Sequence, residues 1–127
     1  MYALIIDDSR AMRRILRQIV EPLGFEILEA GNGQEGLACL HQAGSVEVTL
    51  VDWNMPVMNG LEFVKAVRSD DSWKDMKLVM VTTETEPSQM ARALMAGVDE
   101  FVMKPFTADI LIDKMRLIGV ALTTAAE

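Results

Sequence analysis

Five short runs of apolar and β-branched residues alternate along this chain with segments whose apolar residues recur at the helical period. The five runs span residues 3–6, 25–30, 46–51, 77–81 and 100–103. Where strands and helices alternate in this way, each strand–helix–strand unit forms a right-handed crossover and the strands pair in parallel. Helices then cover both faces of the sheet. The pattern therefore predicts one doubly wound α/β domain.

The expected helices have recognisable ends. The first begins after Ser9, a favourable N-cap residue, and ends at Gly24, a residue typical of the position after a helix. Four more helices are expected over residues 34–42, 60–69, 88–96 and 107–119. The run at 25–30 alternates with two glutamates, which predicts an edge strand, whereas the run at 46–51 is nearly all apolar, which predicts a central strand.

The bulk composition narrows the class of protein. The chain has 127 residues, half of them apolar, which suits one domain with a substantial core. Its net charge of −7 argues against a nucleic-acid-binding surface, because phosphate backbones attract positive charge. With no signal peptide or membrane-spanning run, a cytoplasmic location is expected. We expect the domain to cover residues 1–121 and residues 122–127 to form a frayed tail.

Polar side chains gather at one edge of the predicted sheet. They stand at the carboxyl ends of the first, third, fourth and fifth strands, and they are Asp7, Asp8, Asp52, Thr82, Thr83 and Lys104. In an open α/β sheet, ligands bind at this edge, in the crevice where the winding direction reverses. If the first and third strands are neighbours, three carboxylates converge there.

Three converging carboxylates favour a bound cation, because without one they would raise one another's pKa. A donor set of oxygens with no His or Cys favours a hard ion such as Mg²⁺. Lys104 adds a compact positive charge and Thr82 a hydroxyl group. A carboxylate nucleophile, Mg²⁺, a lysine and a hydroxyl together are suited to phosphoryl transfer to an aspartate.

Four motifs carry a family resemblance over essentially the whole chain. They stand in the order IIDDSRAMRRIL, VDWNMPVMNGLEF, VMVTTETE and FVMKPF. Asp8 and Asp52 are 44 positions apart, and Asp52 and Thr82 are 30 apart. Another 22 positions lead to Lys104. In motifs, order and spacing the chain resembles the receiver domains of response regulators in two-component signalling, and it looks most like the chemotaxis type.

This resemblance implies a flavodoxin-like (βα)5 fold, with a parallel five-stranded sheet of order 2-1-3-4-5 and helices on both faces. It implies that Asp52 is the phosphoacceptor. Asp8 and Asp52 would ligate Mg²⁺ directly, together with the backbone carbonyl of Asn54. Asp7 would act mainly through a metal-bound water, and Lys104 would pair with the phosphoryl group.

The resemblance also assigns backbone N–H groups to the phosphate site, namely those of Trp53, Asn54 and Thr83. Thr82 would move toward the phosphoryl group, and Phe101 would act as a rotameric switch that fills the vacated space. Many relatives have Tyr at that position; Phe keeps the ring, but it cannot make a hydrogen bond to a partner. The Lys104–Pro105 peptide bond is expected to be cis, as in relatives.

The expected partners follow from the same resemblance. A histidine kinase or a histidine phosphotransfer protein would supply the phosphoryl group. The face formed by residues 88–96, 100–103 and the last helix would then bind a flagellar motor switch protein or another output protein, and Arg92 is the only charge in 88–96. The chain would be a monomeric phosphoacceptor rather than an enzyme, and its acyl phosphate would be hydrolysed between Asn54 and Glu84.

Three alternatives stand beside this interpretation. A metal-dependent phosphatase with an aspartate nucleophile usually needs an acid two residues later, where this chain has Asn54. A flavodoxin-type module binds the FMN phosphate with a Ser/Thr/Gly-rich first loop, whereas the loop DDSRAM contributes two carboxylates that repel phosphate. The third alternative keeps the chemistry and makes the chain a phosphorelay shuttle, or a receiver domain cut from a longer regulator.

Several other features are interpreted as structural. The arginines of the first helix, Arg10, Arg13, Arg14 and Arg17, are taken as a solvated face rather than an anion site. Cys39 and His41 are taken as incidental, and the ten methionines as adaptable core packing.

Overall fold

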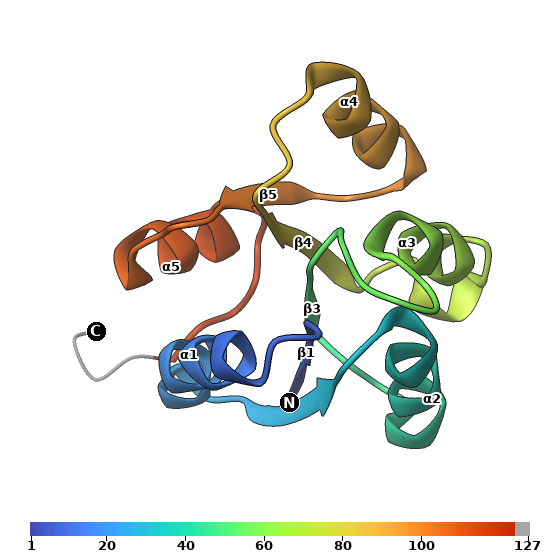
Figure 1. Ribbon diagram of the computed structural model, residues 1–127. Helices are drawn as coiled ribbons and strands as arrows, with labels where there is room; N and C mark the ends of the chain where they lie inside the picture. Colours follow the sequence, from blue (N-terminus) through green and yellow to red (C-terminus); the bar gives the residue numbers. More distant parts are fainter. Residues whose placement is uncertain (124–127) are drawn as a thin grey trace.

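The computed structural model describes residues 1–123, and these build a five-stranded parallel sheet with helices on both sides (Figure 1). The strands are β1 (Tyr2–Ile6), β2 (Glu26–Ala30), β3 (Val48–Val51), β4 (Lys77–Thr82) and β5 (Glu100–Met103). Their order is β2-β1-β3-β4-β5, so the flavodoxin-like class and the expected strand order are confirmed. As predicted, β2 lies at an edge of the sheet and β3 at its centre.

The helices divide between the two faces of the sheet. They are α1 (Arg10–Val20), α2 (Gly33–Ala43), α3 (Gly60–Arg68), α4 (Pro87–Ala96) and α5 (Ala108–Leu117). The helices α1 and α5 cover one face, and α2, α3 and α4 cover the other (Figure 1). Such an arrangement leaves the ends of the strands as the places where loops can form a site.

Strand residues supply both halves of the core because successive side chains point to opposite faces. In β1, Leu4 and Ile6 pack under α2, α3 and α4, whereas Ala3 and Ile5 pack under α1 and α5. All four are at most 1% exposed. Burying a side chain such as Leu4 contributes about 2 kcal/mol. Burial on both faces fixes the pairing register of the central strands. The register in turn determines where the loops at the strand ends leave the sheet.

The first helix ends earlier than its apolar pattern predicts. The α-helix stops at Val20, and a 3₁₀ turn follows over Glu21–Leu23. Pro22 is the physical reason, because proline has no N–H to continue the helical ladder and its ring clashes with the carbonyl four residues earlier. Gly24 then closes the turn with a φ of 104°, in the left-handed region that glycine favours.

The carboxyl end of the described chain is attached to the body of the domain. Leu122 packs against the core under α1 and α5, and the amide of Thr123 donates a hydrogen bond of 2.8 Å to the carbonyl of Leu23. The predicted frayed tail includes residues 124–127, which lie outside the described residues, so the fraying and the domain boundary at 121 stay predictions. In residues 1–123, no helix has both the length and the apolar character needed to cross a membrane.

Candidate functional site

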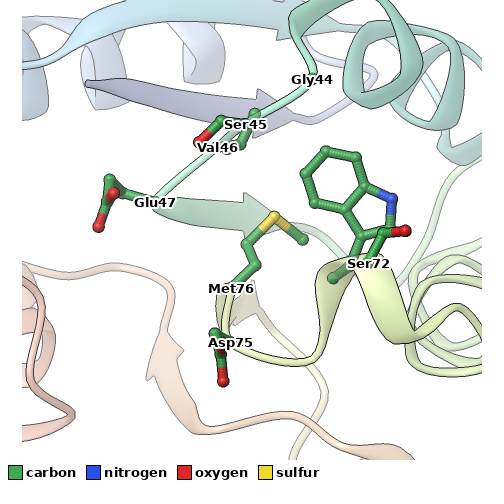
Figure 2. A pocket seen from close by; sticks show the side chains of 8 residues that line it. Gly44, Ser45, Val46, Glu47, Ser72, Asp75 and Met76 are labelled. Atoms are coloured by element: carbon green, nitrogen blue, oxygen red, sulfur yellow. The ribbon is translucent and has the colours of Figure 1, made fainter.

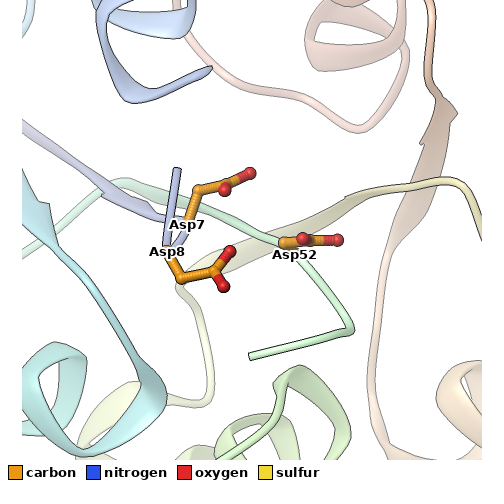
Figure 3. A group of neighbouring side chains, drawn as sticks. All are labelled: Asp7, Asp8 and Asp52. Carbon is orange, nitrogen blue, oxygen red and sulfur yellow. The ribbon is translucent and has the colours of Figure 1, made fainter. Parts of the chain in front are cut away.

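Three carboxylates meet at the carboxyl edge of the sheet (Figure 3). Asp7 and Asp8 come directly after β1, and Asp52 comes directly after β3. One oxygen from each carboxylate lies within 4.8 Å of the others. The sequence-based expectation that these three acids converge is therefore confirmed in the described chain.

Strand pairing brings the acids together. The strands β1 and β3 are parallel neighbours with Ile6 opposite Val51, so the residues that follow each strand leave the sheet side by side. The ladder continues one step further, because the amide of Asp52 donates to the carbonyl of Ile6 at 3.0 Å. On the other side, the amide of Asp7 donates to the carbonyl of Ala30 at 3.1 Å.

Lys104 approaches the acids from the end of β5. Its Nζ lies 2.9 Å from Oδ2 of Asp7 and 3.4 Å from Oδ2 of Asp52. Its amide donates to the carbonyl of Thr82 at 3.0 Å, which holds the start of the loop against β4. The next peptide bond, Lys104–Pro105, is cis. The ammonium group thus neutralises part of the negative charge of the cluster.

The three acids differ in how far their oxygens are already engaged. Asp7 is buried; its Oδ1 accepts from the amide of Ser9 at 2.8 Å, and its Oδ2 accepts from Lys104. Asp52 is 9% exposed, and its Oδ1 accepts from the amide of Trp53 at 2.8 Å. Asp8 is exposed. A hydrated cation can therefore reach Asp8 and Asp52 more readily than Asp7.

The donor set fits a small hard cation. All three groups are carboxylates, and Mg²⁺ is typically held by one or two carboxylates while it keeps several waters. The open side at Asp8 leaves room for those waters. The residues that could hold such a cation are the three acids Asp7, Asp8 and Asp52, which stand in the loops at this edge.

The surroundings of Asp52 disfavour the ionised form of its carboxyl group. Burial raises the pKa of the Asp52 carboxyl above its ordinary value, and the nearby Asp7 carboxylate raises it further. The Lys104 ammonium and the Trp53 amide lower the pKa of Asp52 but do not cancel the rise. A bound cation would offset this cost, because a positive charge nearby stabilises the ionised form of Asp52.

The raised pKa of Asp52 predicts that Asp52→Asn stabilises the metal-free protein at neutral pH. Because the folded protein binds this proton more tightly than the unfolded chain, the Asp52 contribution to stability is present below the unfolded pKa and is lost as pH rises through the folded pKa. We expect a gain of about 1 kcal/mol in the free energy of unfolding at pH 7, shrinking at acid pH. Urea denaturation in a chelator over that pH range measures it. An unchanged or lower stability of Asp52→Asn, with exposed Asp113→Asn as the control, would contradict the assignment.

The residues expected to follow the phosphoryl group are placed as follows. Thr82 is the last residue of β4 rather than the first after it, because its ladder pairing with Met103 continues the sheet. It is fully buried, and its Oγ1 accepts from the amide of Glu84 at 3.1 Å. Thr83 is exposed, and Phe101 is 7% exposed within the core under α2, α3 and α4.

Gly60 also belongs to this site, although its place in the sequence predicts only the start of a helix. Its amide donates to the carbonyl of Trp53 at 2.9 Å, which folds the loop after β3 back on itself. A Cβ at this position would lie 2.2 Å from the backbone oxygen of Asp52. The sequence feature that indicates this role is the Asn59-Gly60 pair. Asn59 is the N-cap of α3, and Gly60 allows the backbone of α3 to approach that of Asp52 closely.

A separate hollow of about 200 Å³ lies at the opposite edge of the sheet (Figure 2). It is lined by the residues just before β3 and β4, among them Val46, Glu47, Asp75 and Met76. None of the predicted site residues lines it. The acids, the lysine and the threonines predicted to form the site lie instead at the carboxyl edge, which is where an open α/β sheet binds its ligands.

Comparison with known proteins agrees with this geometry. Residues 3–116 match the family model described as the response regulator receiver domain. The chain is 42% identical over 119 residues to the chemotaxis protein CheY1 of Helicobacter pylori, covering 93% of this chain and 96% of that protein. It is 44% identical over 116 residues to a chemotaxis protein CheY homolog of Campylobacter jejuni, covering 91% of this chain and 89% of that protein.

A solved structure shares the whole architecture. The chemotaxis protein CheY4 of Vibrio cholerae superposes with a TM-score of 0.86 at 34% identity, over 92% of this chain and 97% of that one. The family match, over residues 3–116, covers all the described strands and helices except the first residue of β1 and the last residue of α5. Fold, acidic cluster and sequence similarity together place the chain in the response-regulator receiver family, among its CheY-like chemotaxis members.

Proposed function

We propose that this receiver domain accepts a phosphoryl group on Asp52 from a histidine kinase or a histidine phosphotransfer protein. The observation that carries the proposal is the meeting of Asp52 with Asp7, Asp8 and the Lys104 ammonium at one strand edge. Asp52 is the acid nearest the centre of the sheet, and its own charge is disfavoured by burial.

The transfer exchanges one bond to phosphorus for another. An Oδ of Asp52 attacks the phosphorus in line, the phosphorus–nitrogen bond of the donor breaks, and the imidazole leaves with the electron pair. Lys104, already within 3.4 Å of Asp52, would balance charge on the phosphoryl oxygens, and the N–H groups of Trp53, Asn54 and Thr83 would donate to them. When bound at Asp8 and Asp52, Mg²⁺ supplies further positive charge at the same oxygens.

Phosphorylation would change the conformation of a face of the domain next to β5. The Thr82 hydroxyl, which accepts from the amide of Glu84, would turn to donate to a phosphoryl oxygen, and the Phe101 ring would move into the space it leaves. The responding face would be that of α4, β5 and α5, whose exposed apolar residues include Leu94 and Met95 at 53% and 88% exposure. A flagellar motor switch protein or another output protein would bind there.

The phosphoryl group would then be lost to water between Asn54 and Glu84, so the chain would return to its unphosphorylated state without a separate phosphatase.

Direct phosphorylation tests the proposal. Incubation with acetyl phosphate and Mg²⁺ should add the mass of one phosphoryl group, and a chelator should prevent the addition. Hydroxylamine should remove the label, because it cleaves acyl phosphates. No mass increase with any phosphodonor in Mg²⁺, or a label stable to hydroxylamine, would contradict the proposal.

Trp53 gives a direct reporter of the metal. The Trp53 indole is 6% exposed, and the Trp53 amide donates to the Asp52 carboxylate. Binding of Mg²⁺, or of the phosphoryl mimic beryllofluoride, at Asp52 should therefore change the fluorescence of Trp53. We expect the change to persist when Trp73 is replaced by Phe and to be lost in Asp8→Asn. A Trp53 signal that does not respond to millimolar Mg²⁺ would count against a metal at this cluster.

A further inference from the structure

Arg13 differs from the other arginines of α1 in where its guanidinium lies. Its side chain is 17% exposed, whereas Arg14 is exposed. Its Nη1 donates a hydrogen bond of 2.6 Å to the backbone carbonyl of Asp7. Its Nε donates to Oε1 of Glu29, on β2, at 3.2 Å. The interpretation of all four arginines as a solvated face is therefore wrong for Arg13, which ties α1 to the ends of β1 and β2.

The carbonyl that Arg13 holds belongs to the peptide unit between two of the acids. This unit joins Asp7 to Asp8 and is planar, so the direction of its C=O bond sets ψ of Asp7 and φ of Asp8 together. The amide of Asp7 is held independently by the carbonyl of Ala30. Fixing both sides of this backbone segment fixes the directions in which the two carboxylates leave the chain.

The guanidinium is itself held in place from the β2 side. Oε2 of Glu29 contacts Nη1 of Arg17, so Glu29 bridges two arginines on successive turns of α1. A Cβ at Gly31 would lie 3.8 Å from Nη1 of Arg13, so the group rests against the turn after β2. Arginine can serve a carbonyl and a carboxylate at once because its donors point in different directions, whereas lysine carries its donors on one nitrogen.

We propose that Arg13 is a positioning residue for the cation site: it holds the Asp7–Asp8 peptide so that the carboxylate of Asp8 faces that of Asp52. The inference rests on the proposed function, which assigns Mg²⁺ to these carboxylates. Mutation of residues that orient metal ligands without touching the metal typically lowers the affinity for the metal by 10- to 100-fold. We therefore expect Arg13→Ala to weaken Mg²⁺ binding about tenfold, although no ligand is removed.

The test is a Mg²⁺ titration of the intact chain at constant ionic strength. Binding is followed by tryptophan fluorescence and, independently, by the Mg²⁺-dependent rise in melting temperature. Arg14→Ala is the matched control, because it removes the same charge from the neighbouring, exposed position, and its affinity should stay within about twofold of the wild type. Arg13→Lys keeps the charge but not the fork of donors, and it should bind Mg²⁺ several-fold more weakly than the wild type.

The outcomes separate positioning from charge. Wild-type affinity in folded Arg13→Ala would overturn the role of Arg13. An equal loss in Arg14→Ala would also overturn it, because net charge would then explain the effect. If Arg13→Ala does not fold, Arg13→Lys decides: a several-fold loss supports the proposal, and unchanged affinity overturns it. A wild-type chain that does not bind Mg²⁺ at all would instead contradict the proposed function, and this role with it.

Discussion

Asp52→Asn is expected to abolish phosphorylation by any phosphodonor, with a loss of at least about a hundredfold in the rate of labelling. The amide nitrogen and oxygen of Asn cannot form a stable acyl phosphate, and of the other two carboxylates Asp7 is buried, whereas Asp8 is the proposed metal ligand. Asp7 is engaged by Ser9 and Lys104 through both oxygens. The measurement is the initial rate of mass increase or radiolabel incorporation from acetyl phosphate and from a phosphorylated kinase.

The control for Asp52→Asn removes a carboxylate of the same kind from elsewhere. Asp113→Asn, exposed on α5, should be labelled at the wild-type rate. Because Asp52→Asn is expected to be at least as stable as the wild type, loss of labelling cannot be attributed to unfolding. Labelling of Asp52→Asn at the full rate, or a phosphoryl group mapped to another residue in the wild type, would show that the acceptor is misassigned.

Gly60→Ala is expected to lower the free energy of unfolding by about 3 kcal/mol. The added Cβ would lie 2.2 Å from the carbonyl oxygen of Asp52, and the clashing atom belongs to the backbone, so no side chain can rotate away. The alanine gains helix propensity at the start of α3, but that gain is below about 1 kcal/mol. Thermal denaturation should show a melting temperature lower by roughly 10 °C.

Gly31→Ala provides the control for Gly60→Ala. A Cβ at Gly31 would meet its nearest atom, Oε1 of Glu35, at 3.5 Å, which is an ordinary van der Waals contact. Its stability should stay within about 0.5 kcal/mol of the wild type. If Gly60→Ala were as stable as Gly31→Ala, the close approach of α3 to the phosphoacceptor loop would be wrong. If the chain folds, weaker Mg²⁺ binding should accompany the loss of stability, because Asp52 must shift.

The local pattern predicted a parallel sheet and the edge at which it binds ligands, whereas the strand order that makes β1 and β3 neighbours followed from the family resemblance. Alternating strands and helices determine the parallel topology, and an acid after each of two neighbouring strands must reach the same edge. The ends of elements were less predictable, since they depend on single residues. Pro22 ended α1 early, and the pairing of Thr82 with Met103 extended β4 by one residue.

The contacts of individual side chains and the backbone conformations inside loops could not be predicted from the pattern. The bond from Arg13 to the Asp7 carbonyl depends on the exact path of the chain between β1 and α1, and an arginine on an amphipathic helix ordinarily faces solvent. Val57 shows the same limit in the backbone: it is 75% exposed with a φ of 68°, although β-branched residues rarely adopt that region. Val57 lies in the loop after β3, and its residue type alone does not predict this backbone conformation.

In the proposed function, acids from the ends of β1 and β3 share one divalent ion, and Asp52 takes the phosphoryl group opposite Lys104. The decisive measurement is a crystal structure of the protein with Mg²⁺ and beryllofluoride, a mimic of the phosphoryl group. We expect beryllium bonded to an Oδ of Asp52, Mg²⁺ at about 2.1 Å from oxygens of Asp8 and Asp52, and Nζ of Lys104 close to a fluoride. Beryllofluoride on another residue, or Mg²⁺ bound without Asp8 and Asp52, would contradict the proposed function.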